Sequence, residues 1–513
     1  MKFLKSNKEF KEKILSAYQV GADHTLPADL DVARSIMPAG TATFRDFSTV
    51  APDLPSFIPE KCVGCMECVI SCPDTAILAK VVTEKTLEEA LHTFEKDTQN
   101  RLKKTFIKTT KYYDVYQKKG QEGGLFNITV DPQKCKGCAE CVTACGEHAA
   151  LQMTKKNPTL LKEAYEASTF FNCLSETEPS FINERLLVDM MLAQRSLLYT
   201  GGAGSCMGCG EGTAIRMMLA ATGFSHGEKS CAIVASTGCN TVFGSTYPYN
   251  PYLVSWTNSL FENSPAVAMG IRARWDQLGY KNKKLWVMGG DGAMLDIGFQ
   301  SLSRLFMSGM DINVLVLDTQ VYSNTGGQAS TASYTAQNAK MSTVGTVIPG
   351  KTERRKEIGL LSLMHPDVFV AQTVTAIPNH FYKAIMTAND YPGVALINVY
   401  TPCPPEHGIG DDLGQHQSKL AVTTRAFPLF IYDPRVGKKL KERLSLRGNP
   451  NPTEDWAQDP KTGKVLDFIS FARTEGRFAK QFDKDGHPSE ILVKAQKDRL
   501  DYWHLLQELG GVI

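Results

Sequence analysis

Apolar and polar positions in the second half of the chain predict a strand, a loop, a helix and a second strand in succession. Residues 284–288 form an apolar run that ends in the glycine-rich segment 289–292, and residues 312–317 form a second apolar run. In a parallel α/β sheet, such a unit brings Asp291 and the segment 318–321 to the carboxyl ends of neighbouring strands, where ligands bind. The apolar residues at helical spacing between the two runs are Leu295, Phe299, Leu302, Leu305 and Phe306.

This sheet edge carries the residues of a diphosphate pocket. Gly290 and Gly292 allow a ligand to approach the backbone closely, and free N–H groups at the start of the helix, near Met294, suit a diphosphate. Asp291 can hold the magnesium ion that a diphosphate needs. A lone Gly-Asp-Gly tripeptide is more often only a turn. Here it follows a strand and precedes a helix, and a polar loop ending at Asn324 follows the next strand. This context favours a cofactor site.

The ends of the chain give weaker signals. Residues 1–55 hold a short basic helix candidate and a segment interrupted by Pro, Gly and Thr. They are either an arm packed on another element or a poorly ordered terminus. The periodicity predicts a helix over residues 184–199 and a final amphipathic helix over residues 491–511. Four histidines have no metal-like spacing and are interpreted as structural or surface groups: His365, His380, His407 and His416.

The cysteines follow patterns typical of iron-sulfur proteins. The chain has 14 cysteines and no apolar signal sequence, which favours metal binding over disulfides. The spacing C-x2-C-x2-C-x3-C occurs twice and is specific for two [4Fe-4S] clusters of the bacterial ferredoxin type, in which the fourth cysteine of each motif binds the other cluster. One cluster is expected on Cys62, Cys65, Cys68 and Cys145, and the other on Cys135, Cys138, Cys141 and Cys72.

Two features of these motifs leave alternatives. Zinc receives little weight, because tetrahedral zinc sites use two C-x2-C pairs rather than two quartets. Gly146 stands where the first motif has Pro73, but proline is not a ligand and the cluster should persist. The insertion between the motifs is interpreted mainly as a solvated helix and hairpin. The alternative is a docking surface for an acidic electron acceptor, made by Lys103, Lys104, Lys108 and Lys111.

A third cysteine group contains Cys206 and Cys209 in the sequence CMGCGE. A C-x2-C pair alone fits redox thiols, zinc or a cluster. The neighbouring glycines do not fit the G-x-G-x-x-G nucleotide motif. Cys173 and Cys231 have no metal-like neighbours, and both are expected to be ordinary packed residues.

The runs GDGAMLDIGFQSL and LDTQVYSNTGGQ resemble the 2-oxoacid:ferredoxin oxidoreductases, and the pyruvate enzymes of that family most closely. The resemblance covers residues 55–435 and corresponds to the C-terminal part of the long single-chain enzyme. It implies an α/β fold with a parallel-sheet domain that binds thiamine diphosphate. It also implies a small bacterial-ferredoxin-like α+β domain with two [4Fe-4S] clusters.

The resemblance further implies roles for residues at the sheet edge. Asp291, Thr319 and the Val321 carbonyl match the magnesium ligands of the family. Asn324 matches a residue beside the reacting carbon, where its amide can hydrogen-bond a developing oxyanion. Glu211 matches a family position near the cofactor that is not the position of the activating glutamate.

The motif CMGCGE resembles the family's motif for a third, proximal [4Fe-4S] cluster. The two remaining ligands are expected at the ends of apolar, strand-like runs over residues 231–237 and 393–400. The segment 256–279 resembles the helix that enters the cofactor domain, and Asn258 and Glu262 are weaker candidates for the site. The implied ligands of the third cluster are Cys206, Cys209, Cys239 and Cys403.

Four segments are expected along the chain. They are an N-terminal arm (1–55), a ferredoxin-like domain with a basic insertion (56–155), a thiamine diphosphate domain with the proximal cluster (156–430), and a C-terminal extension that could embrace a partner (431–513). The activating glutamate of the family lies in a separate pyrimidine-binding domain, for which no second α/β pattern is found. A partner subunit is therefore expected to supply it, in a dimer of heteromers.

The implied activity is the oxidative decarboxylation of pyruvate with coenzyme A, with electrons passed to ferredoxin or flavodoxin. The cofactors are thiamine diphosphate, Mg²⁺ and three [4Fe-4S] clusters. Two alternatives remain. The first is the same chemistry on 2-oxoglutarate, a branched or aromatic 2-oxo acid or oxalate, and the second is an electron-transfer subunit without thiamine.

Composition adds little to this picture. A formal net charge of +2 and 21% charged residues give no global argument for nucleic acid or membrane binding. The chain has no run of about 18 apolar residues that would predict a membrane span. A cytoplasmic location is expected.

Overall fold

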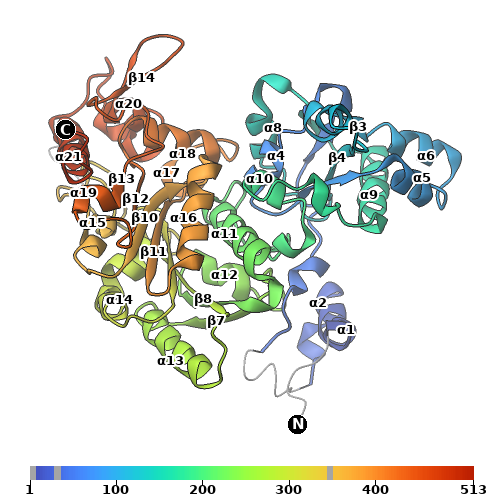
Figure 1. Ribbon diagram of the computed structural model, residues 1–513, viewed down its shortest axis with the longest axis horizontal. Helices are drawn as coiled ribbons and strands as arrows, with labels where there is room; N and C mark the ends of the chain where they lie inside the picture. Colours follow the sequence, from blue (N-terminus) through green and yellow to red (C-terminus); the bar gives the residue numbers. More distant parts are fainter. Residues whose placement is uncertain (1–6, 28–35, 344–349) are drawn as a thin grey trace. The chain divides into compact units, whose positions relative to one another are not determined.

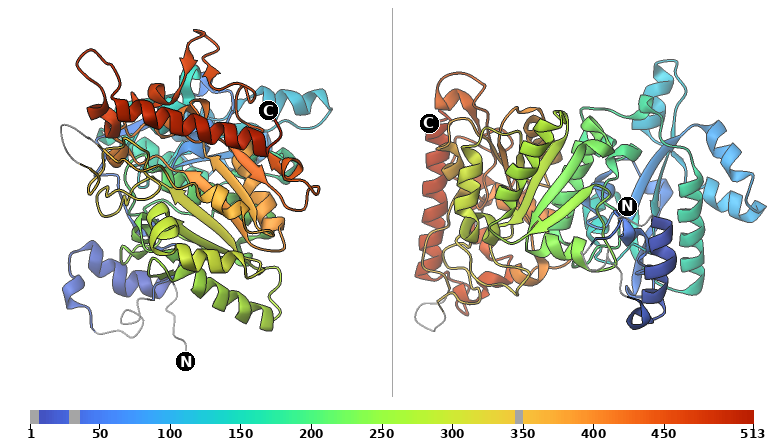
Figure 2. Two further views of the ribbon diagram at one scale, coloured as in Figure 1. Left: turned by 90° about the vertical axis from the view of Figure 1, so that its left-hand side faces the viewer. Right: turned by 90° about the horizontal axis from the view of Figure 1, so that it is seen from below.

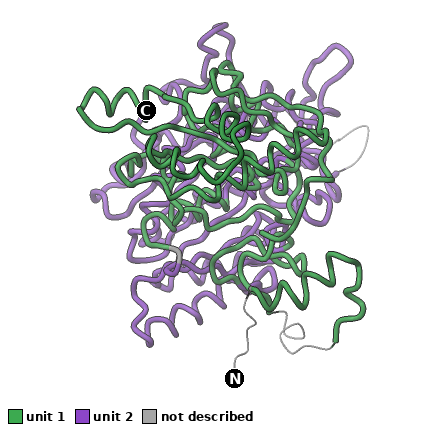
Figure 3. Tube along the Cα trace, turned by 90° about the vertical axis from the view of Figure 1, so that its right-hand side faces the viewer, with its two compact units in different colours: residues 1–207, 215–228, 242–256 green, residues 208–214, 229–241, 257–513 purple. Residues whose placement is uncertain are grey.

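The computed structural model describes residues 7–27, 36–343 and 350–513. The chain forms two compact units (Figure 3). Unit 1 comprises residues 1–207, 215–228 and 242–256, and unit 2 comprises residues 208–214, 229–241 and 257–513. The expected division at residue 155 therefore differs from the structure, because residues 156–207 stay with the cysteine-rich unit. Part of the expected N-terminal arm, residues 1–6 and 28–35, lies outside the described residues.

Unit 1 holds the two cysteine quartets between short antiparallel strands. β2 (Ile77–Val82), β4 (Leu125–Val130) and β3 (Ile107–Lys108) form one sheet in the order β2-β4-β3. β1 (Asp53–Phe57) pairs with β5 (Leu151–Lys155). The quartets run into two short helices, α4 (Glu67–Ser71) and α8 (Glu140–Cys145). The other helices of this part are α1 (Asn7–Phe10), α2 (Ser16–Gln19), α5 (Glu84–Leu91), α6 (Lys96–Lys103), α7 (Val115–Lys118), α9 (Pro158–Cys173) and α10 (Leu187–Met190).

The helix predicted over residues 184–199 is wrong. Only the single turn α10 and a short 3₁₀ turn (Gln194–Ser196) form there. Asp189 is buried and accepts hydrogen bonds from the Tyr112 hydroxyl (2.9 Å) and the Asn183 backbone N–H (3.1 Å), which holds the chain in a compact turn. Met191 and Leu192 pack into the core of unit 1. Cys173, expected to be packed, is exposed at the end of α9.

Unit 2 is built around an eight-stranded sheet in the order β13-β12-β10-β11-β9-β8-β6-β7. The five strands from β10 to β6 run parallel. They are buried along almost their whole length, because helices cover both faces and only apolar runs tolerate such burial (Figures 1 and 2). The strand bounds are β6 (Cys231–Ser236), β7 (Ser255–Ser259), β8 (Lys284–Gly290), β9 (Asn313–Asp318), β10 (Phe369–Val374), β11 (Ala395–Tyr400), β12 (Phe430–Tyr432) and β13 (Leu444–Ser445).

The helices of the sheet domain supply its two cores. Leu302, Ile358 and Trp503 pack with sheet residues in one cluster, whereas Ala421 and Phe471 belong to another. The helices that lie wholly in unit 2 are α13 (Ser264–Gln277), α14 (Phe299–Phe306), α15 (Ile358–Leu363), α16 (Pro378–Asp390), α17 (Pro404–His407), α18 (Gly414–Thr423), α19 (Leu440–Arg443), α20 (Phe468–Ala472) and α21 (Glu490–Leu509). Two helices are divided between the units, α11 (Gly210–His226) and α12 (Cys239–Ser245). None of the described helices is both long enough and apolar enough to cross a membrane.

The C-terminal residues are an integral part of unit 2. β12 pairs with β10 and β13 pairs with β12, both antiparallel, so the expected boundary at residue 430 falls inside a strand of the sheet. A small hairpin, β14 (Ala457–Gln458) with β15 (Val465–Leu466), follows. The predicted final helix is confirmed as α21, and its N-cap is Ser489, whose side chain accepts a hydrogen bond from the Leu492 N–H. Figure 2 shows α21 as the long red helix.

Candidate functional site

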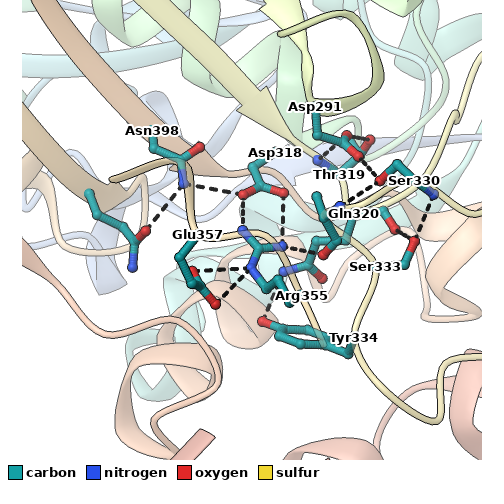
Figure 4. Close-up of polar contacts among 12 residues, drawn as sticks. Asp291, Asp318, Thr319, Gln320, Ser330, Ser333, Tyr334, Arg355, Glu357 and Asn398 are labelled. Carbon is teal, nitrogen blue, oxygen red and sulfur yellow. Dashed lines mark hydrogen bonds and ion pairs between the residues drawn. The ribbon is translucent and has the colours of Figure 1, made fainter. Parts of the chain in front are cut away.

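The ends of β8 and β9 meet, as the sequence predicts. Asp291 directly follows β8, is fully buried, and lies beside Thr319, which directly follows β9. Asp291 Oδ1 accepts hydrogen bonds from the Thr319 backbone N–H (3.2 Å) and Thr319 Oγ1 (3.0 Å). Ser330 donates to the other carboxylate oxygen (Figure 4). The Asp291 carboxylate is thus held in one orientation.

Three oxygen atoms at this edge have the spacing of a magnesium site. Thr319 Oγ1 lies 3.0 Å from Asp291 Oδ1 and 3.0 Å from the Val321 carbonyl oxygen. In an octahedral Mg²⁺ site with bonds of about 2.1 Å, neighbouring ligand oxygens are about 3.0 Å apart. The residues present therefore fit the metal. Burial, followed by the Asp318 charge, raises the pKa of Asp291, and a bound divalent cation would favour its ionised form.

The helix after Asp291 differs from the expected one. Residues Gly292–Ile297 form a π-helical turn, closed by a 2.7 Å hydrogen bond from the Gly298 N–H to the Ala293 carbonyl, and α14 begins only at Phe299. Such wide turns are frequent at functional sites. A Cβ on Gly292 would lie 2.3 Å from the Tyr322 ring, so glycine is required there for the two loops to pack.

A cavity of about 70 Å³ opens beside the three oxygens. Glu211, Cys239 and Phe261 line it, together with Asn324, which is exposed. The weaker candidates Asn258 and Glu262 are not among its lining residues. Its full lining is Glu211, Thr237, Gly238, Cys239, Phe261, Gly290, Asp291, Gly292, Ala293, Thr319, Val321, Tyr322, Ser323, Asn324 and Thr325.

Glu211 is the most perturbed acid of the cavity. It is buried, and among the described residues its Oε2 has no hydrogen-bond partner. Burial, followed by the Asp291 charge, raises its pKa to about 8. Burial therefore favours the protonated form of Glu211, which can donate a hydrogen bond into the cavity, as expected for a group that a ligand completes.

A buried ion pair holds the end of β9, where the Thr319 loop begins. Asp318, the last residue of β9, pairs with Arg355, and both side chains are almost fully buried (Figure 4). Asn398 on β11 donates a hydrogen bond of 3.2 Å to Asp318, and Glu357 pairs with Arg355. The pair fixes the strand end from which the predicted metal ligands project.

The cysteine quartets in unit 1 come together in the crossed arrangement that the sequence predicts. Cys62, Cys65, Cys68 and Cys145 line one small cavity. Cys72 lies near the three cysteines of the second motif. Burial and, more weakly, the Cys72 charge raise the pKa of Cys135, Cys138 and Cys141. Each group of four thiols can hold one [4Fe-4S] cluster.

The third cysteine group is divided between the units. Cys206 belongs to unit 1, whereas Cys209, Cys239 and Cys403 belong to unit 2. Within unit 2, the Gly210 N–H donates a 3.1 Å hydrogen bond to the Pro402 carbonyl, which joins the Cys209 and Cys403 loops. Cys239 lines the cavity that also contains Asp291. Cys231 is buried in β6, and burial raises its pKa to about 12, as expected for an inert thiol.

Sequence reasoning missed two groups of the site. Ser330 holds Asp291, but nothing in the sequence pattern distinguishes it from an ordinary loop serine. His407 was expected to be structural, and the structure gives it two specific partners: its Nε2 lies 2.8 Å from the Thr319 carbonyl and its Nδ1 lies 3.4 Å from the Cys403 N–H. Its spacing of four residues from Cys403, at a short helix, was the available signal.

Comparisons with known proteins match both units. Residues 236–399 match the family described as thiamine pyrophosphate enzyme, C-terminal TPP binding domain, and residues 61–149 match the 4Fe-4S dicluster domain. These matches and the parallel sheet confirm the predicted fold class.

Full-length relatives are also similar to the chain. The "Probable pyruvate-flavodoxin oxidoreductase" of Escherichia coli is 27% identical over 87% of this chain and 41% of its own length. The pyruvate:ferredoxin oxidoreductase of Moorella thermoacetica is 27% identical over 98% of this chain and 46% of its own length. The chain thus spans less than half the length of these relatives.

Proposed function

The chain belongs to the family of pyruvate:ferredoxin and pyruvate-flavodoxin oxidoreductases, and from this premise we propose that it is the subunit that binds thiamine diphosphate and carries the electrons. The reaction is the oxidative decarboxylation of pyruvate. Pyruvate and coenzyme A give acetyl-CoA, CO₂, a proton and two electrons, and the two electrons reduce two ferredoxins or a flavodoxin. The reverse reaction uses the same groups.

The observation that carries this proposal is the set of three oxygens on Asp291, Thr319 and Val321 at the rim of a cavity that Cys239 also lines. A magnesium ion on these oxygens would hold the diphosphate. Gly290 leaves room beside the backbone, because a Cβ there would meet only the Leu317 carbonyl oxygen, at 3.8 Å. Thiamine diphosphate, when bound, supplies the carbon nucleophile and the electron sink for decarboxylation.

The chain's own residues would position the cofactor and polarise a substrate oxygen. Asn324, which lines the cavity, can donate its amide hydrogens to a substrate oxygen as that oxygen gains charge. Glu211, which is buried, would donate a hydrogen bond to the cofactor in its protonated form. Neither residue removes the proton that activates the cofactor, a task for the glutamate of the pyrimidine-binding domain.

Three [4Fe-4S] clusters carry the electrons outward, one at a time. The third cluster, on Cys206, Cys209, Cys239 and Cys403, would be the first to take electrons from the cofactor, because Cys239 lines the cofactor cavity. The two crossed quartets of unit 1 then relay each electron to ferredoxin or flavodoxin. The close association of a thiol ligand with the cofactor cavity argues against the rival function, electron transfer without thiamine.

A second polypeptide completes the site. The cavity of about 70 Å³ is far smaller than the roughly 300–1,000 Å³ of an enclosed ligand pocket, so the described residues form one wall. The partner contributes the pyrimidine-binding domain, the activating glutamate and the coenzyme A site, in a dimer of heteromers.

The test is a panel of 2-oxo acids assayed on the complete complex by reduction of a low-potential dye, with and without coenzyme A. Pyruvate is expected to be the preferred substrate, and the isolated chain to be inactive. Preference for 2-oxoglutarate, a branched or aromatic 2-oxo acid or oxalate would keep the chemistry and change the substrate. Decarboxylation of pyruvate by the isolated chain would disprove the need for a partner.

A further inference from the structure

His407 lies fully buried between two functional loops of unit 2. Its Nε2 is 2.8 Å from the carbonyl oxygen of Thr319, and its Nδ1 is 3.4 Å from the backbone nitrogen of Cys403. A carbonyl oxygen only accepts hydrogen bonds, and a backbone N–H only donates. Nε2 must therefore carry the hydrogen, and Nδ1 must be the acceptor. Both ring nitrogens are used in one defined, neutral tautomer.

Each partner of His407 belongs to a different site. Thr319 carries the hydroxyl that lies 3.0 Å from both Asp291 Oδ1 and the Val321 carbonyl. Cys403 directly precedes α17, at whose end His407 lies, and the His407 N–H also donates a 2.8 Å hydrogen bond to the Cys403 carbonyl. One imidazole thus joins the loop of the proposed magnesium site to the loop of a proposed cluster ligand.

A buried polar network prevents the ring from turning. Tyr400 stacks on His407 with ring centroids 5.8 Å apart, and its hydroxyl donates to Glu475 Oε1 at 2.9 Å. Gln417 donates a 3.0 Å hydrogen bond to the same oxygen, and Arg477 pairs with Glu475. Because the Tyr400 hydroxyl hydrogen is used by Glu475, the Cys403 N–H remains the donor to His407 Nδ1. The network fixes the ring in the orientation that reaches both loops.

We propose that His407 is a positioning residue that couples the magnesium-diphosphate site to the third cluster. This inference rests on the proposed function, which assigns Thr319 to the metal and Cys403 to the cluster. The Thr319 loop would hold the metal, so order in this loop would reach the Cys403 N–H through the ring, whose two nitrogens bond both loops. Hydrogen bonds and dipoles near the sulfurs set the potential of a cluster. Coupling of this kind is reciprocal.

The experiment measures both sites without turnover. The complete complex is prepared anaerobically, and thiamine diphosphate binding is measured by calorimetry in saturating Mg²⁺. The electron paramagnetic resonance spectrum and midpoint potential of the third cluster are recorded with and without thiamine diphosphate. In the wild-type complex, thiamine diphosphate is expected to shift both the spectrum and the midpoint potential of the third cluster.

Two substitutions of His407 distinguish its hydrogen bond to Thr319 from its hydrogen bond with Cys403. His407→Leu removes both hydrogen bonds, so it is expected to weaken thiamine diphosphate binding about tenfold and to abolish the shift. His407→Gln keeps a donor for Thr319 and removes the ring nitrogen Nδ1 that accepts from the Cys403 N–H. Its binding should stay within about threefold of wild type, while the shift is lost. This variant serves if the leucine variant does not fold. The control is His380→Leu, because His380 is also buried but bonds Thr373 instead (2.9 Å); it should retain the shift.

The outcomes distinguish this inference from the proposed function. A wild-type complex that lacks the third cluster or binds no thiamine diphosphate would overturn both. A wild-type shift that persists in His407→Leu, or in His407→Gln if the leucine variant does not fold, would overturn the coupling role alone. Loss of the shift in the control as well as in the His407 variants would also overturn it, since the effect would then follow from any buried histidine.

Discussion

The two kinds of site in this chain are specified in different ways. Each four-cysteine motif of unit 1 occupies eleven residues of sequence, residues 62–72 and 135–145, and its spacing alone indicates the metal. The cofactor edge of unit 2 is assembled instead from the ends of β6, β8, β9 and β11, with groups between Glu211 and His407. A local motif is readable without the fold, whereas a site at a sheet edge depends on strand order. Substitutions in a cysteine motif should therefore affect only the clusters that it binds, whereas substitutions at the sheet edge should affect several groups of the site.

Pairs of cysteine substitutions give the largest expected effect. In the crossed arrangement, Cys62→Ser with Cys145→Ser removes ligands of one cluster, so the chain loses about four iron atoms. Cys62→Ser with Cys72→Ser removes one ligand from each cluster, and about eight iron atoms are lost. Iron analysis of anaerobically purified protein measures the difference. The reverse result would mean that each motif fills its own cluster, and equal losses would also contradict the crossed assignment.

Asp291→Asn tests the sheet-edge site. It removes the charged oxygen ligand and should weaken thiamine diphosphate binding by about 100-fold or more, since the loss of groups behind the ligands already costs 10–100-fold. Iron content should be unchanged. Calorimetry with Mg²⁺ present measures the affinity. The control is Asp367→Asn, an exposed carboxylate of the same unit, which should bind as wild type does; a similar loss in both variants would remove the argument for a specific metal ligand.

Arg355→Met breaks the ion pair behind the same edge. It leaves the fully buried Asp318 without its cation, and the free energy of unfolding should fall by about 3–5 kcal/mol. Lys497→Met is the control, because the Lys497 and Asp501 side chains are 71% and 37% exposed and their ion pair should contribute about 1 kcal/mol or less. Denaturant unfolding compares the two. Equal losses would show that the buried pair gives this strand end no special support.

His380 gives unit 2 a pH-dependent stability. Burial, followed by the Lys383 charge, lowers its pKa to about 4, against about 6.5 in an unfolded chain. Between pH 6.5 and 4 the unfolded state binds the proton and the folded state does not, so stability falls as pH falls, by about 3 kcal/mol in total. Above pH 6.5 and below pH 4 this residue adds no slope. His380→Gln should flatten the curve, while the exposed His416→Gln should not; a wild-type slope in His380→Gln would contradict the assignment.

The basic insertion gives the smallest expected effect. Lys103 pairs with Glu88 and Lys111 pairs with Asp189, so the proposed docking surface is reduced mainly to Lys104 and Lys108. Lys104→Glu with Lys108→Glu should slow ferredoxin reduction a few-fold at low salt and less at high salt. Dye reduction by the same complex should be unaffected and serves as the control. An unchanged ferredoxin rate at low salt would rule out this surface.

The parts of the sites that could be predicted are those encoded in local sequence, and the parts that could not are those assembled from distant segments. The quartets and the strand ends at Asp291 and Thr319 could be predicted because spacing and apolar runs encode them. Ser330 and Arg355 could not, since their roles arise only when loops distant in sequence meet the strand ends. The single turn at residues 187–190 replaced a predicted helix because a buried Asp189 recruits Tyr112 from another element. β12 was missed because its three residues are too few for a periodic signal.

The most direct test of the account is the cofactor content of the complex, prepared anaerobically with Mg²⁺ and thiamine diphosphate. The account predicts about twelve iron atoms, as three clusters of four, and one thiamine diphosphate for each copy of this chain. Eight iron atoms and no thiamine diphosphate would contradict it, because the chain would then carry electrons through two clusters without a cofactor site at the sheet edge.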